Sequence, residues 1–313
     1  MISVKDRIDF YKGKLLNQNK RFSLKKYSRT NTKINYNDLN IKFYTSSRDL
    51  NTYYLIHERL YTLPMKNLLV HYNHINKPFL LSIGDIWYPK ENKPIDIPVF
   101  TKNRFCDSKD DCSIILRSLN FDRHWKLYYN PPRDMLFEHK KDVLFWRGVS
   151  TGSPDKPGSR FKLVEKWYNK RNYIDIGFSD IVQNRYKWSR YKKGKNVPPS
   201  VFLQHKYILS VEGNDKDSGL NWKLNSRSLV LMAKPRYQSW LMESKLQPGI
   251  HYVLLKDDFS DLDDKIKWCN NNQNACKWII QNANFYMRQF SNPMLEKLIE
   301  KEIINSYFKC VHN

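Results

Sequence analysis

Short apolar runs alternate with helix-like segments from Asp142 onward. The runs are DVLFW, NYIDIGF, YILSV, SLVLMA and HYVLL, and polar stretches or helix-like segments such as SRFKLVEKWYNK separate them. This alternation is typical of an α/β domain with a mainly parallel sheet.

The first 140 residues are less regular, but they contain NLLV, PFLLSIGD and IPVFTK as candidate strands. They predict a second α/β domain, with a boundary near the pair Pro131 and Pro132. The tail from Ser260 is predicted to be helical, with Ser260 as an N-cap three residues before Asp263, and with Pro293 opening the last helix. The predicted parts are therefore residues 1–132, 133–290 and 291–313, the last a helix that packs back on the two domains.

Composition narrows the class of protein. The chain has 313 residues and 41% apolar residues, enough for two ordinary domains. No stretch approaches the roughly 18 apolar residues that a membrane span requires, and the amino terminus has no apolar signal region. Five cysteines, an odd number without a CxxC pair, are typical of reduced thiols in a cytoplasmic protein.

The charge is strongly positive. Fifty-four Lys and Arg against 31 Asp and Glu give a formal net charge of +23, which predicts an anionic partner: nucleic acid, an acidic membrane surface or a phosphorylated substrate. Residues 1–50 and 181–211 concentrate this charge. In the second segment Tyr186, Trp188 and Tyr191 alternate with basic residues, as in a nucleic-acid or sugar-phosphate groove. The alternative is a solvated basic loop whose aromatic rings cover a neighbouring core.

Three predicted strands end in residues with unusual chemistry, and ligands of parallel sheets bind beyond such ends. The first is YILSVEGNDKDSGLNW, in which glycines permit a tight turn and polar side chains can cap the next helix or bind phosphate. The candidate residues are Gly213, Asn214, Asp215, Ser218 and Gly219. The pattern is neither G-x-G-x-x-G nor a P-loop, and an ordinary turn between strand and helix is the alternative.

The second strand end is DVLFWRGVSTGS, residues 142–153. A fixed cation followed by hydroxyl and backbone donors suits a diphosphate. The candidate residues are Arg147, Gly148, Ser150, Thr151 and Gly152. The structural alternative is that Arg147 pairs with a neighbouring carboxylate.

The third is PFLLSIGDIWYP, in which Asp85 follows a buried strand. A carboxylate there could act as a general base that removes a proton from an acceptor hydroxyl. The alternative is that Asp85 only caps a turn.

Taken in order, SIGDIWYP with IPVFTKNR, LFWRGVSTGS, and YILSVEGND with SGLNWKLNSRSLVLM and SWLMESKLQPGIHYVLLKDDFSDL resemble glycosyltransferase family 90. The resemblance covers roughly residues 80–289 and is closest to the bacterial lipopolysaccharide-modifying members. It implies a GT-B architecture of two Rossmann-like domains facing across a cleft. Residues 133–290 would hold the nucleotide sugar, and residues 1–132 would serve the acceptor.

The resemblance also implies roles for single residues. Asp85 matches the family's catalytic aspartate, and residues 147–152 match a loop implied to hold the diphosphate. Residues 213–221, which end at Asn221, match the nucleotide loop, and Glu243 is expected near the ribose or uracil. Many relatives carry Arg or Lys where Asn221 aligns, so Lys216 or Lys223 is a candidate for the missing cation.

Family 90 transferases are expected to invert the anomeric centre, to use UDP-sugars and to need no metal or other cofactor. The DxD pattern of Asp261 and Asp263 resembles a metal site, but its place at a helix start favours capping. The expected reaction is a single displacement by an acceptor hydroxyl, with Asp85 as base. The expected acceptor is lipopolysaccharide core or another surface glycan, reached from the cytoplasm with contact to an anionic membrane. A nucleic-acid-binding protein and an inactive scaffold on a transferase fold remain the alternatives.

Overall fold

The computed structural model describes residues 1–18, 20–23, 41–44, 63–74, 77, 79–82, 85, 98–107, 112–119, 121–194 and 197–312. Its contacts divide the chain into two compact units. Unit 1 comprises Met1–Phe121, Tyr237–Leu241 and Asn292–Asn313, and unit 2 comprises Asp122–Arg236 and Met242–Ser291. The division falls at residue 121 where the sequence suggested Pro132.

Unit 2 is built around a five-stranded parallel sheet of order β12-β10-β9-β7-β8. Its strands are β7 (Lys141–Val149), β8 (Ile174–Asp180), β9 (His205–Leu209), β10 (Leu229–Met232) and β12 (Val253–Leu254). In chain order the first strand, β7, lies between the second and the third, so the direction of winding reverses between β7 and β9. This is the doubly wound arrangement that leaves a crevice at the reversal point.

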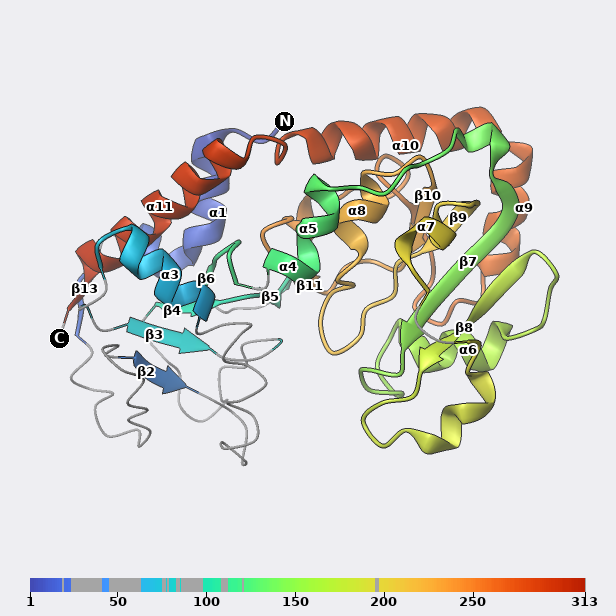
Figure 1. The fold of residues 1–313 in the computed structure, drawn as a ribbon, viewed down its shortest axis with the longest axis horizontal. Helices are drawn as coiled ribbons and strands as arrows, with labels where there is room; N and C mark the ends of the chain where they lie inside the picture. Colours follow the sequence, from blue (N-terminus) through green and yellow to red (C-terminus); the bar gives the residue numbers. More distant parts are fainter. Residues whose placement is uncertain are drawn as a thin grey trace. The chain divides into compact units, whose positions relative to one another are not determined.

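Helices cover both faces of this sheet (Figure 1). The helices from Phe121 to Arg288 are α4 (Phe121–His124), α5 (Lys126–Tyr129), α6 (Arg160–Trp167), α7 (Pro199–Phe202), α8 (Leu220–Leu224), α9 (Leu262–Asn271) and α10 (Gln273–Arg288), with 3₁₀ turns at Phe137–His139, Tyr186–Tyr191 and Glu243–Lys245. Side chains of α6 and α9 join the main core on one face, whereas Phe202 of α7 packs edge-on against Phe145 of β7 on the other.

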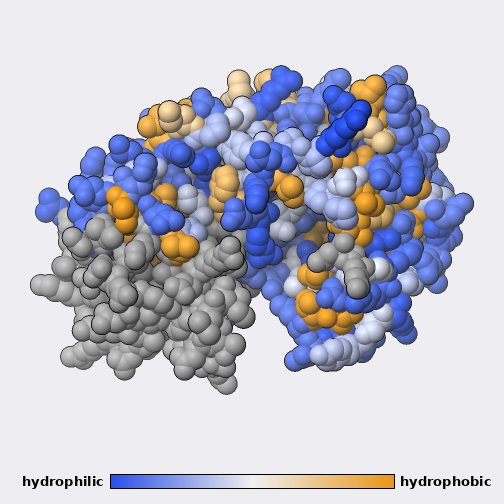
Figure 2. All heavy atoms as spheres, in the orientation of Figure 1, coloured by the Kyte–Doolittle hydropathy of each residue, from blue (hydrophilic) through white to orange (hydrophobic). Residues whose placement is uncertain are grey.

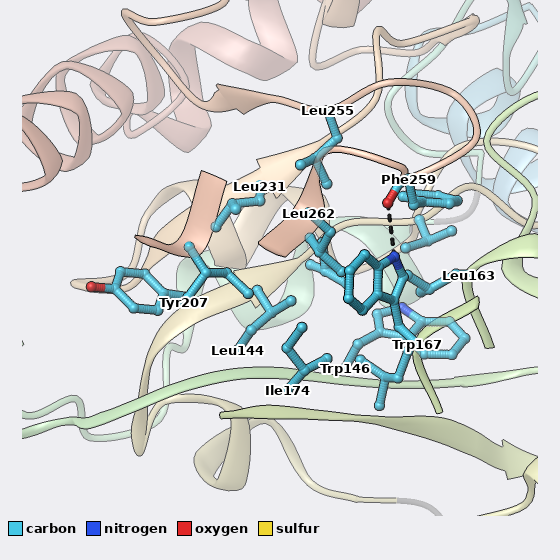
Figure 3. Packing of buried hydrophobic residues seen from close by; sticks show 14 of the residues in the cluster. Leu144, Trp146, Leu163, Trp167, Ile174, Tyr207, Leu231, Leu255, Phe259 and Leu262 are labelled. Atoms are coloured by element: carbon cyan, nitrogen blue, oxygen red, sulfur yellow. Dashed lines mark hydrogen bonds between the residues drawn. The ribbon is translucent and has the colours of Figure 1, made fainter. Parts of the chain in front are cut away.

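The main core of unit 2 forms where apolar residues of β7 meet α6. Figure 3 shows Leu144 and Trp146 packed with Leu163 and Trp167, whose indole N–H donates to the Phe259 carbonyl at 2.7 Å. Side chains alternate along a strand, so the same strand presents its intervening residues to the opposite face.

The core also takes in Trp188 and Tyr191 of the basic segment, both buried, whereas Tyr186 is 73% exposed. For these two rings the alternative prediction, aromatic residues that cover a neighbouring core, is the one observed.

Unit 1 contains a four-stranded parallel sheet of order β2-β3-β4-β6. Its strands are β2 (Ile41–Tyr44), β3 (Phe79–Ser82), β4 (Val99–Thr101) and β6 (Ser113–Ile115), and two short pairs join β1 (Phe22–Ser23) to β13 (Val311–His312) and β5 (Arg104–Phe105) to β11 (Tyr237–Gln238). Helices among its described residues are α1 (Val4–Asn17), α3 (Leu63–His71) and α11 (Pro293–Cys310). The prediction of an α/β protein with parallel sheets and a helical carboxyl-terminal tail is confirmed.

Helix α11 is an integral part of unit 1, where it lies beside α1 (Figure 1). The buried Glu296 carboxylate accepts from Arg7 at 2.7 Å and from the Trp240 indole at 2.5 Å. The Tyr11 ring stacks on Trp240 at 3.8 Å between centroids. Because removing one partner would leave a buried charge unpaired, this cluster ties three distant stretches of the chain together.

The helix starts test two predictions about capping. Pro293 opens α11, and the Asn292 side chain caps it by accepting from the amide of Met294 at 3.0 Å. The prediction for Ser260 is wrong, because α9 starts at Leu262 and Asp261 occupies the N-cap position.

Candidate functional site

The loops that follow β7 and β9 meet at the reversal point of the unit 2 sheet. The two strands are parallel neighbours, with Leu144 beside Tyr207, so both loops leave from the same edge. The Gly152 amide donates to the Asn214 side-chain oxygen at 2.9 Å. We call residues 150–152 and 212–219 the strand-end loops. The structure thus brings together two sequence motifs that lie about sixty residues apart, at the position where doubly wound sheets bind ligands.

Two glycines permit this close approach. Gly152 has φ +94°, and a Cβ atom there would lie 2.7 Å from the Gly213 carbonyl oxygen. A Cβ atom on Gly213 would lie 2.5 Å from the Thr151 hydroxyl oxygen. Any larger residue at either position would push the loops apart.

Arg160, the first residue of α6, is buried and donates hydrogen bonds to the end of β7, to the loop after β7 and to the chain just beyond β9. Its guanidinium donates to the Val149 carbonyl and the Thr151 hydroxyl at 2.8 Å each, and to the Val211 carbonyl at 3.0 Å. Burial lowers its pKa, while the charges of Asp217 and Asp215 act in the opposite direction. An arginine remains charged under these conditions, so Arg160 is a fixed cation beneath the loops.

Lys156 is a second cation at the strand-end loops, and its ammonium donates to the Gly213 carbonyl. The pKa of Lys156 is lowered to about 8, chiefly by burial; the charge of Glu212 acts against this shift, and those of Arg236 and Arg160 contribute to it. Glu212 itself pairs with Arg236 at 3.0 Å.

Arg185 is a third. Its guanidinium approaches the Gly152 carbonyl at 3.5 Å and lies over the Phe161 ring. Its Nε is buried without a hydrogen-bond partner among the described residues. Sequence reasoning placed neither Arg160 nor Lys156 in the site, although both follow the RGVSTGS motif within a few residues.

The side chain of Arg147, in contrast, lies on the face of the sheet opposite to Trp146, where it contacts Asp175 and Phe145. It pairs with Asp175 at 2.8 Å, donates to three backbone carbonyls and lies over the Phe145 ring. Burial raises the pKa of Asp175, but hydrogen bonds from Lys193 and Arg147 outweigh it and hold the pKa below its usual range. The structural alternative foreseen for Arg147 is therefore the one observed.

Ser150 also serves the scaffold. It is fully buried, donates to the Val182 carbonyl at 3.0 Å and accepts from the Val182 amide at 2.7 Å. Gly148 belongs to β7, where a Cβ would meet the Trp146 ring at 2.7 Å. Among the residues predicted in RGVSTG, Thr151 and Gly152 are the two that lie against the second strand-end loop.

The second loop ends in buried ion pairs. Lys216 pairs with Glu243 at 2.8 Å, both 1% exposed, and donates to the Asn221 side-chain oxygen at 2.7 Å. Lys223 pairs with Asp217 at 2.5 Å. Both lysines weighed as the second phosphate cation are thus engaged inside unit 2.

The remaining predicted residues of this motif lie in the loop and in the first turn of α8. Asn221 is fully buried, and its side-chain nitrogen has no partner among the residues described. Ser218 and Gly219 are partly exposed at the start of α8, where the Gly219 amide donates to Asp217 at 2.9 Å. Asp215 is buried, and its backbone carbonyl accepts from the Gly213 amide at 2.9 Å.

Asp85 belongs to unit 1, beyond the carboxyl end of β3. Its carboxylate pairs with Lys102 at 2.9 Å, and its carbonyl accepts from the Asn103 side chain at 3.1 Å. The Asp85 side chain is 31% exposed, whereas that of Lys102 is 1% exposed. The carboxylate is thus held in place from below and is still accessible, a geometry compatible with a general base.

The described ranges of the chain contain no group of three His, Cys, Asp or Glu side chains placed to hold a metal ion. The DxD carboxylates are engaged elsewhere. Asp263 accepts from Tyr173 at 2.5 Å and pairs with Lys267 at 2.8 Å, and Asp261 accepts from the Lys256 amide at 3.0 Å. Among the described helices, none is long and apolar enough to cross a membrane.

A family model and a curated relative both match more than half of this chain. Residues 124–301 match the model of glycosyl transferase family 90. O-glucosyltransferase LpsA of Dichelobacter nodosus is 32% identical over 243 residues, which cover 78% of this chain and 70% of LpsA. Human protein O-glucosyltransferase 3 is 24% identical over 231 residues, which cover 69% of this chain but only 43% of that protein.

Among solved structures, HepE of Anabaena in complex with UDP-glucose aligns with a TM-score of 0.46 and 12% identity, over 77% of this chain and 75% of HepE. Because the family model matches more than half of the chain and LpsA is similar over most of its length, the chain belongs to glycosyl transferase family 90.

Proposed function

We propose that this protein transfers a sugar, glucose in the first instance, from a UDP-sugar to a hydroxyl group of a glycan such as lipopolysaccharide core. The observation that carries the proposal is the meeting of the strand-end loops at the reversal point of the unit 2 sheet, with Lys156, Arg160 and Arg185 around them. Glucose is favoured because the relatives named above are O-glucosyltransferases.

The strand-end loops would hold the diphosphate of the donor. Phosphate oxygens suit backbone amides at the ends of parallel strands, and they suit fixed cations that need no reorganisation. Lys156 and Arg185 would contact the diphosphate, while the buried Arg160 would add charge from below. We assign Asn221 and Glu243 to the binding of the nucleoside because both contact Lys216 of the second strand-end loop.

The proposed chemistry is a single displacement at C1 of the sugar. The acceptor oxygen attacks C1 and its proton passes to Asp85, while UDP leaves with the electron pair of the broken C1–O bond. Attack opposite the leaving group inverts the configuration at C1. Negative charge grows on the departing phosphate, and the cations of the strand-end loops would stabilise that charge without a metal.

The alternative of a nucleic-acid-binding protein has less support from the geometry. Stacking on single strands requires exposed rings, and of the three aromatic residues that alternate with basic ones, Tyr186, Trp188 and Tyr191, only Tyr186 is well exposed. An inactive scaffold would have lost turnover while it retained the fold, and an activity assay with UDP-glucose distinguishes it.

The test is a calorimetric titration of the full chain with UDP-glucose in excess chelator. We expect binding by the wild type, and a loss of roughly tenfold to a hundredfold in Arg185→Ala, the usual effect of removing a hydrogen bond to a charged group. Arg185 makes few internal contacts, so this change should spare the fold.

Arg147→Ala is the matched control, since Arg147 is committed to Asp175 on the opposite face. It should lower the unfolding temperature and leave the affinity for UDP-glucose nearly unchanged. No binding by the wild type, or greater loss in Arg147→Ala than in Arg185→Ala, would contradict the proposed site.

A further inference from the structure

Unit 2 contains a cavity of about 600 Å³ that none of the strand-end loop residues lines. It lies against the edge strand β12 and helices α9 and α10, and its wall includes Leu254, Trp268, Trp278 and Ile279. This volume is typical of sites that bind small molecules, which combine apolar walls with a few polar groups.

Two tryptophans at this cavity are unusually accessible. Trp268 of α9 is 41% exposed and Trp278 of α10 is 52% exposed, whereas Ile279 beside them is buried. In Figure 2 hydrophobic surface appears among hydrophilic surface over helix α10. Indole rings combine a large apolar face with one polar edge and favour partners that are themselves amphipathic.

The charge around the cavity differs from that of the whole chain. The charged residues of its wall are one acid and one base, Asp264 and Lys265, so the formal charge of the wall is zero in a protein of +23. A polyanion or an acidic membrane gains little from this wall, because the carboxylate offsets the attraction of the ammonium group.

The polar groups of the wall separate the remaining ligand classes. Asp264 and Lys265 both line the cavity. An acyl chain laid against them would desolvate a carboxylate and an ammonium without replacing their hydrogen bonds. A pyranose offers an apolar C–H face to the indoles and hydroxyl groups to both charged side chains.

We propose that this cavity binds a neutral oligosaccharide, whose sugar rings stack on Trp268 and Trp278 and whose hydroxyl groups hydrogen bond with Asp264 and Lys265. The site is distinct in its residues from the strand-end loops and binds sugar without reacting with it. Its existence does not depend on the transfer reaction proposed above.

The test uses the full chain labelled with 5-fluorotryptophan and titrated with maltopentaose and cellopentaose, with ¹⁹F resonances assigned through Trp→Phe variants. We expect at least one of these oligosaccharides to shift the signals of Trp268 and Trp278. Trp278→Ala should weaken this binding at least about fivefold and leave UDP-glucose binding unchanged.

Phe285→Ala is the matched control, because Phe285 lies on the same helix, is 49% exposed and does not line the cavity. It should retain oligosaccharide binding. The proposal is overturned if neither sugar shifts the two signals, if Phe285→Ala weakens binding as much as Trp278→Ala, or if only phosphatidylcholine vesicles shift them. Because UDP-glucose binding is measured on the same variants, failure here is distinguishable from failure of the proposed function.

Discussion

Lys156 shows how burial tunes one residue of the strand-end loops. Its pKa of about 8 lies well below the ordinary 10.5, chiefly because burial disfavours the ammonium form. The ammonium remains mostly protonated at neutral pH and loses its proton as the pH rises through about 8. If Lys156 contacts the donor diphosphate, its charge therefore disappears within an accessible pH range.

We expect the affinity for UDP-glucose to fall as the pH rises above about 8. The diphosphate of UDP-glucose keeps its charge over this range, so the fall would report on the protein. Lys156→Arg keeps a permanent cation and should remove the pH dependence. Calorimetric titrations across the range measure both, and an identical pH dependence in the variant would exclude Lys156 as the cause.

Asp85 carries the prediction about turnover. Asp85→Asn keeps a polar group beside the buried Lys102, but the amide cannot take up the proton of the attacking hydroxyl group. Release of UDP from UDP-glucose should fall by roughly two to four orders of magnitude, the usual range for loss of a general base. The affinity for UDP-glucose, measured separately, should hardly change. A parallel loss of affinity and turnover would mean that Asp85 supports donor binding instead.

At the scale of the element, the loops after β7 and β9 meet at the proposed donor site, and Gly213 permits their contact. Gly213→Ala would place a Cβ 2.5 Å from the Thr151 hydroxyl and 3.1 Å from the Arg160 guanidinium carbon. Overpacking of this kind typically costs about 1–3 kcal/mol. We expect a lower unfolding temperature in calorimetry together with weaker UDP-glucose binding.

Gly194→Ala is the control for this change. Gly194 has φ +79°, and no atom lies within 4 Å of the place that a Cβ would take, so an alanine there adds backbone strain without a clash in the loops. A slightly lower unfolding temperature with unchanged UDP-glucose affinity is expected. Equal losses of affinity in both variants would show that strain in general, and not the contact between loops, weakens the site.

At the scale of the whole molecule, the net charge of +23 determines which surfaces attract the protein. The two most basic segments are residues 1–50 and 181–211; residues 19, 24–40 and 45–50 of the first and 195–196 of the second lie outside the described part of the chain. Lipopolysaccharide core and the cytoplasmic leaflet are both anionic, so a basic protein that modifies such an acceptor would concentrate at that surface.

We expect the chain to sediment with vesicles that contain phosphatidylglycerol and to be released as salt rises, because screening shortens the range of these interactions. Phosphatidylcholine vesicles should not bind it. Trp278→Ala should bind anionic vesicles as the wild type does, since the wall of the cavity beside Trp278 has one acidic and one basic residue and therefore no net charge. Binding that ignores lipid charge and salt would contradict an electrostatic attachment.

Local patterns in the sequence determined much of the architecture. Alternating runs report burial and periodicity, which are local properties, and they predicted a mainly parallel sheet from Asp142 onward, a second α/β part before it and a helical tail. Pro293 has a fixed φ and lacks an amide hydrogen, so it marked the start of α11 correctly. The motifs around Gly152 and Gly213 were found because glycine at a strand end has a conformational meaning that the sequence carries by itself.

Tertiary structure decided which side chains meet. Arg147 was the expected cation of the site, but strand alternation turned it toward Asp175, and Arg160 from the next helix took the place beneath the loops. The segment Tyr237–Leu241 and helix α11 belong to unit 1, where both contact α1, which is far away in sequence. A linear pattern specifies which residues are buried, whereas the strand order and the return of distant segments determine their partners, and those depend on packing of the whole chain.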